Sequence, residues 1–243
     1  MKTLIYFICC FLLLFSQKET FAQCCAAGNP VSTNCTVSEG GKDILMVNLS
    51  YIYSKSDTYY NGTERLDKKY LESYFNFSSL SLSYGISNNL RLTSDIGYFL
   101  NKGQKFAVSD YTRYTQGIAD LNLGLVYNAY KSEDKLFEVL QTARFTIPVG
   151  PFNQQYDGIV MPIDEQPSSG NFKYNIGLTL SKKFENSSFT LLSVNSFEIS
   201  KMIETETSFH KYGNLYNLSV MGLYRISSAV TGMLQLRSEI REK

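Results

Sequence analysis

Apolar and polar residues alternate along most of this chain from residue 44 onward. In the clearest segment, 118–128, Leu121, Leu123 and Leu125 alternate with Asn122 and Gly124. Alternation with a period of two places the two sets of side chains on opposite faces of a β-strand. The pattern predicts nine strands, at residues 44–53, 73–84, 90–98, 118–128, 137–147, 172–181, 189–199, 215–225 and 230–240.

The connections between these segments alternate in length. The long polar ones are residues 54–72, 100–116, 148–170 and 200–214, and short turns lie near Ser87, Ser132, Asn186 and Ser228. Outer-membrane β-barrels have long outer loops and tight periplasmic turns. A soluble β-sandwich also has many short strands, but it has no reason to alternate its loop lengths. We therefore predict an all-β, transmembrane, antiparallel up-and-down β-barrel, with the long connections outside the cell.

Nine strands are an odd number, whereas bacterial single-chain barrels have an even one. The chain also stops at Lys243, in or just past a predicted strand and without a terminal aromatic residue. We expect from this that the sequence is truncated at its C-terminus and that the complete barrel has about ten to twelve strands.

The N-terminus has the features of a secretory signal peptide. Lys2 precedes an apolar run from Leu4 to Phe15, and Thr20-Phe21-Ala22 fits a cleavage site. A membrane anchor is the alternative, but a spanning helix needs about 20 apolar residues. The expected organisation is a signal peptide at 1–22, a periplasmic leader at 23–43 and the barrel at 44–243, exported to the outer membrane after cleavage near Ala22.

Three cysteines, Cys24, Cys25 and Cys35, remain after cleavage, in a compartment where disulfides persist. Because three is odd, at most one bridge forms between them, either Cys24–Cys35 or Cys25–Cys35. Metal binding by three cysteines without a nearby fourth ligand is the weaker alternative.

The composition of the chain narrows the range of expected binding partners. Formal net charge is +1, which argues against a nucleic-acid partner. The 18 Tyr and 16 Phe residues are enough for the aromatic girdles of a barrel. The expected partners are outer-membrane lipid, the barrel-insertion machinery and a small-molecule solute.

The sequence contains no pattern typical of an enzyme. His210 is the only histidine, and it lies with Ser208 in a polar loop without a third group to orient it. Asp164 and Glu165 are flanked by prolines and could form an acidic mouth or a cation site. A solvated loop is the simpler interpretation. We expect no catalytic residue, cofactor or metal.

Charged and amide residues on the polar faces of the strands should point into the lumen. There they either line an aqueous path or pair with each other and narrow it. In particular, Asp120 and Arg144 are expected to form an ion pair across neighbouring strands. The full set of lumen candidates is Arg91, Asp95, Asp120, Asn122, Glu138, Arg144 and Lys173.

Three stretches resemble a family of outer-membrane barrels named for a protein of the meta-cleavage pathway of phenol degradation. Gln116–Tyr127 is similar to its Gly-x-(Gly/Ala)-Asp-Leu strand opening. Thr142–Gly150 is similar to the following strand, with Val149 in place of the usual Thr, and the tail LQLRSEIREK to a later one. The leader resembles those of Bacteroidetes-type envelope proteins. The resemblance implies a barrel that passes small, often hydrophobic molecules.

Two functions fit these features. The first is an outer-membrane channel or transporter for small molecules. The alternative is a non-conducting structural or surface-interaction barrel, whose long loops, rich in tyrosine at Tyr59, Tyr60, Tyr111 and Tyr114, bind a partner outside the cell.

Overall fold

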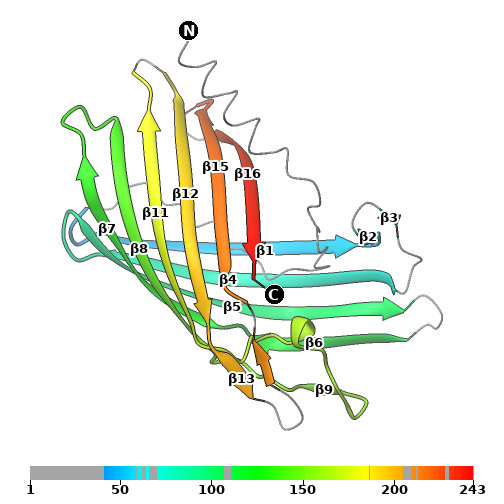
Figure 1. The fold of residues 1–243 in the computed structure, drawn as a ribbon. Coiled ribbons are helices and arrows are strands. Elements are labelled where there is room, and N and C mark those ends of the chain that lie inside the picture. The colour runs from blue at the N-terminus through cyan, green and yellow to red at the C-terminus, as the bar shows by residue number, and fades with distance from the viewer. Residues whose placement is uncertain are drawn as a thin grey trace.

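The computed structural model describes residues 41–242 except 59, 62–63, 66–69, 107–110, 186, 205–208, 212 and 228–229. Long antiparallel strands form one sheet that curls into a half-barrel (Figure 1). The predicted all-β fold is confirmed. The strands of the main path are β1 (Leu45–Ser56), β4 (Tyr70–Gly85), β5 (Leu90–Phe106), β7 (Leu121–Lys131), β8 (Phe137–Ile147), β11 (Lys173–Lys183), β12 (Phe189–Ser200), β15 (Leu215–Arg225) and β16 (Thr231–Arg241).

Each of these strands pairs with its neighbours along the chain, which is the up-and-down order that the sequence predicts. Among the described residues, β1 and β16 form the two edges of the sheet. The described part of the chain contains no helix long and apolar enough to cross a membrane.

The two faces of the sheet differ in chemistry. On one face Leu45, Val47 and Leu49 of β1 lie beside Tyr84, Leu82 and Leu80 of β4, and most of these side chains are exposed. Their neighbours in sequence fall on the other face, because successive residues of a strand alternate. We call the apolar, exposed side the outer face and the polar side the inner face.

One prediction about the connections is wrong. Residues 100–116, expected to be a loop, are mostly strand: β5 continues to Phe106, and β6 (Thr112–Ile118) pairs with its second half. Lys102 lies opposite Thr115, and Gln104 opposite Arg113. These segments are polar on both faces, so they lack the apolar alternation that marks the rest of the wall. Among the described residues the sheet therefore has ten strands, one more than expected.

Between β6 and β7 the strand is interrupted at Ala119 and Asp120. Gly117 has φ 144°, a conformation that L-residues rarely adopt, and a Cβ there would lie 2.8 Å from Cγ of Pro151. A Cβ on Gly150 would collide with the carbonyl oxygen of Ile118. Both glycines are required because residues 148–151 cross tightly over this break.

The long connections carry short strand pairs at one end of the half-barrel: β2 (Tyr60–Asn61) with β3 (Glu64–Arg65), β9 (Gln155–Tyr156) with β10 (Ile159–Val160), and β13 (Met202–Glu204) with β14 (Phe209–Lys211). The 3-10 helix η1 (Ile163–Glu165) lies in the connection that follows β10. Residues 1–40, with the predicted signal peptide and Cys24, Cys25 and Cys35, lie outside the described residues, as do Ser208 and Tyr59.

Candidate functional site: a loop fastened to the inner face

The connection between β8 and β11, residues 148–172, folds against the inner face of the sheet, and we call it the inner loop. Seven of its residues are buried although it is a connection: Met161, Glu165, Gln166, Pro167, Ser168, Ser169 and Asn171. Loops of soluble proteins and barrels normally run over the surface, because their backbone polar groups need water or a partner. The partners here are side chains of β5, β6 and the β6–β7 break.

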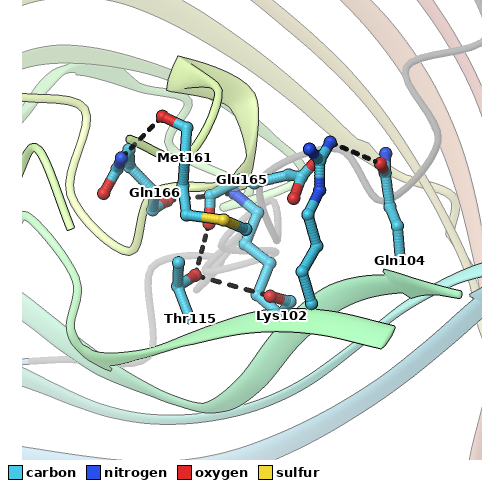
Figure 2. A network of polar contacts seen from close by, with 7 residues as sticks. Lys102, Gln104, Thr115, Met161, Glu165 and Gln166 are labelled. Atoms are coloured by element: carbon cyan, nitrogen blue, oxygen red, sulfur yellow. Dashed lines mark hydrogen bonds and ion pairs between the residues drawn. The ribbon is translucent and has the colours of Figure 1, made fainter. Parts of the chain in front are cut away.

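Lys102 and Thr115 hold the backbone of the inner loop (Figure 2). Lys102 Nζ donates a hydrogen bond to the carbonyl oxygen of Gln166 at 3.2 Å, and Thr115 Oγ1 donates to the carbonyl oxygen of Glu165. Lys102 is only 3% exposed, and its ammonium lies 4.9 Å from the centre of the Phe99 ring. The inner loop and the Phe99 ring therefore both stabilise this buried ammonium.

Arg113 and Glu165 form a buried ion pair between β6 and the inner loop. Arg113 Nη2 lies 2.6 Å from Glu165 Oε1 and donates a second hydrogen bond, of 3.0 Å, to Gln104 Oε1. The guanidinium also lies over the ring of Phe106. Burial raises the pKa of the Glu165 carboxyl above its ordinary value, and Arg113 opposes that shift by stabilising the carboxylate. The expectation of a fully solvated Asp164–Glu165 segment is therefore wrong for Glu165, whereas Asp164 is exposed.

Gln166 closes the inner loop on itself. Its side-chain oxygen accepts a hydrogen bond from the Gln154 backbone N–H at 2.9 Å, and its side-chain nitrogen donates to the carbonyl oxygen of Met161 at 2.8 Å. Gln154 in turn donates from Nε2 to the carbonyl oxygen of Gln116 on β6. The loop is thus internally braced as well as attached to the wall.

Asp120 anchors the far end of the inner loop. Its carboxylate accepts hydrogen bonds from Ser168 Oγ at 2.6 Å, from the Ser169 backbone N–H at 3.1 Å and from Ser169 Oγ. The predicted ion pair with Arg144 is wrong, because Arg144 lies opposite Gly124, four residues further along β7. At about 3.3 Å per residue that offset is roughly 13 Å, beyond the reach of an ion pair.

An apolar cluster of buried side chains lies on the inner face beside Lys102. Phe77 and Phe99 have ring centres 4.7 Å apart, and Phe75 and Phe99 meet edge to face at 6.0 Å. Ile52 and Ala119 pack against them. These aromatic rings face inward, and the Phe99 ring contacts the ammonium of Lys102, which binds the inner loop.

The other lumen candidates lie on the same inner face but apart from the loop contacts. Glu138 is buried and pairs with Lys131 at 2.8 Å, and Asn122 accepts a hydrogen bond of 2.6 Å from Thr146 Oγ1. Asp95 and Arg144 both line a small cavity of about 80 Å³ in the middle of the wall. Arg91 is buried near the short-turn end, and Lys173 lies opposite Thr146 and Ser200. The strand register brings these residues to one face, as the alternation predicts.

Two of the loop tyrosines are used within the protein. Tyr156 of β9 lies 6.0 Å from Tyr111 and 5.5 Å from Tyr114, measured between ring centres. This cluster joins the inner loop to the hairpin formed by β5 and β6. Among the described residues, no group of three or more His, Cys, Asp or Glu side chains is placed to hold a metal ion.

Sequence reasoning missed Lys102, Gln104, Arg113, Thr115 and Gln166. The sequence does contain a pattern that indicates them. Lys102 and Gln104 are two residues apart in β5, as Arg113 and Thr115 are in β6, so each polar pair lies on one face of its strand. The adjacent Gly150 and Pro151, where the chain crosses the β6–β7 break, also mark the beginning of the inner loop.

A solved structure with this architecture is the crystal structure of an outer membrane channel from Pseudomonas putida F1. The two chains superpose with a TM-score of 0.68 at 14% sequence identity, over 86% of this chain and 76% of that chain. The two chains share the fold of a curled, antiparallel up-and-down β-sheet. No protein-family model and no curated protein sequence matches this chain. The resemblance to the family named for the phenol meta-pathway therefore stays a prediction.

Proposed function

We propose that this protein is an outer-membrane channel for small molecules and that the inner loop narrows its path. The observation that carries the proposal is a loop fastened to the inner face by Lys102, Arg113, Thr115 and Asp120. A barrel that only needed a filled interior could use side chains alone. A braced loop instead sets the width of a path while leaving the wall unchanged.

The lining supports solutes with both polar and apolar parts. Inner-face serines, threonines and charged residues are interspersed with Leu140, Leu192 and Met221. We include hydrophobic solutes in the proposal for this reason. The outer face, with its exposed Leu, Val and Tyr side chains, is the surface that would contact membrane lipid.

The full-length chain, refolded into planar lipid bilayers, tests conduction directly. We expect discrete single-channel steps, and swelling of loaded liposomes that falls off with increasing sugar size, because the inner loop restricts the width. Empty liposomes and liposomes carrying heat-unfolded protein are the controls. Absence of both conductance and swelling in correctly folded protein would support the alternative, a non-conducting barrel.

The proposed topology in the outer membrane gives a second prediction. Single cysteines at Asp57 or Asp164, in a variant with Cys24, Cys25 and Cys35 changed to serine, should react with a membrane-impermeant thiol reagent on whole cells. One at Asn88 should react only after lysis. All three positions are exposed on the protein, so access from outside the cell is what differs. Equal labelling of Asp164→Cys and Asn88→Cys on intact cells contradicts the proposed orientation.

A further inference from the structure

A second polar site lies at the opposite end of β5 from Lys102, where the short turns are. A cleft of about 370 Å³ opens there between the β4–β5 turn, β7 and the β7–β8 turn. That volume is in the range of small-molecule pockets, which run from about 300 to 1,000 Å³. It shares no residue with the inner-loop contacts described above.

The cleft is lined by more positive than negative charge. Arg91, Lys131 and Lys135 face it. The acidic group that opposes them is Glu138, which pairs with Lys131 at 2.8 Å and acts electrostatically on Arg91. With Glu138 counted beside them, the residues that line the cleft carry three positive charges against one negative charge.

The nearby carboxylate of Asp134 belongs to its own turn rather than to the cleft. It accepts hydrogen bonds from Ser132 Oγ and from the backbone N–H of Leu136. Neither Asp134 nor Glu133 of this turn lines the cleft, whereas Lys135 does. Lys135 has φ 57° and its side chain is exposed at the rim.

Amide groups complete the lining. Asn88, Asn89 and Asn128 border the cleft, and the backbone N–H of Asn128 donates to the carbonyl oxygen of Asn89 at 2.7 Å, which ties the β4–β5 turn to β7. The buried side-chain oxygen of Asn128 has no hydrogen-bond partner among the described residues. Side-chain amides beside cations donate to an oxyanion, and the free acceptor suits a hydroxyl on the same ligand.

We propose that this cleft binds small oxyanions, organic carboxylates or phosphates, at the end of the half-barrel where the short turns lie. Positive charge and amide donors select the anionic group, and Val126 and Leu140 offer a limited apolar wall. Such a site would concentrate anionic solutes at one mouth of the lumen. Binding here requires only the folded chain, so it can be measured whether or not the barrel conducts.

The test is calorimetric titration of the full-length protein in detergent with succinate and, separately, with inorganic phosphate at low ionic strength. Lys135→Asn removes the rim charge, and asparagine tolerates positive φ. Lys135→Asp reverses the charge with the same tolerance. We expect saturable binding to the unmodified protein, about fivefold weaker binding to Lys135→Asn, and a larger loss for Lys135→Asp.

Lys182→Asn and Lys182→Asp are the matched controls, because Lys182 is an exposed lysine at the same end of the sheet but on the outer face. They should bind both probes like the unmodified protein. Succinate binding without phosphate binding, or the reverse, identifies which oxyanion the site takes. Equal losses in the Lys135 and Lys182 variants, or no saturable binding of either probe, would overturn the proposal.

Discussion

Arg113→Met should lower the free energy of unfolding by about 3 kcal/mol and release the inner loop from β6. The variant leaves Glu165 buried without its cation, and removing one partner of a buried pair costs about 3–5 kcal/mol. We take the lower end because the Arg113 side chain is 16% exposed. Urea unfolding in a fixed detergent, together with limited proteolysis of the inner loop, measures both effects.

The exposed pair between Lys55 and Glu72 is the control at the same end of the half-barrel. Lys55→Met should change neither stability nor proteolysis measurably, because solvent-exposed pairs contribute little. The double variant Arg113→Met/Glu165→Gln should recover much of the lost stability, since no buried charge is left unpaired. If Arg113→Met lowered the free energy of unfolding as little as Lys55→Met does, the Arg113–Glu165 pair would not hold the inner loop.

The stability of the single variant Arg113→Met should depend on pH. Burial raises the pKa of Glu165, so the folded protein binds this proton more tightly than the unfolded chain does. This proton stabilises the folded protein fully at pH values below the ordinary carboxyl pKa of 4.5. Its contribution to the free energy of unfolding is lost as the pH rises through the higher pKa of Glu165 in the folded protein. In Arg113→Met the deficit should be larger at pH 7 than near pH 5.

Leu125→Arg should destabilise the barrel by about 2–4 kcal/mol in a lipid host. Leu125 lies near the middle of β7 on the outer face, between Leu92 and Ala143, and 44% of its surface is exposed. The guanidinium of an arginine at this depth of the bilayer would have neither water nor a hydrogen-bond partner. Unfolding by urea in liposomes measures the change in free energy.

Thr93→Arg is the inward control for Leu125→Arg. Thr93 lies one residue along β5 from Leu92, on the inner face, and lines the same small cavity as Asp95. An arginine there can extend into the lumen, so the lipid penalty does not apply. A larger loss for Thr93→Arg than for Leu125→Arg would mean that the faces are assigned the wrong way round.

Alternation of side chains alone predicted the strands of the wall and their faces. Leu121, Leu123 and Leu125 face outward and Asn122 and Gly124 inward because a strand has a period of two, and this holds whatever the strand pairs with. The up-and-down order also followed from the sequence, since short polar turns can join only antiparallel neighbours. Arg91, Asp95 and Glu138 could be placed on the inner face in the same way.

Which inner residues meet was decided by register and by the path of the inner loop. Asp120 was predicted to meet Arg144 from an assumed pairing, but the break at Gly117 and the register of β7 direct it to Ser168 and Ser169 instead. The sequence around Glu165 predicts a surface residue, because its neighbours in the chain are prolines and polar residues. It is buried because Lys102, Thr115 and Arg113, more than 45 residues away, supply the partners that its segment needs. Local pattern fixes the face of a residue, whereas contacts across such sequence distances depend on the register and curvature of the whole sheet.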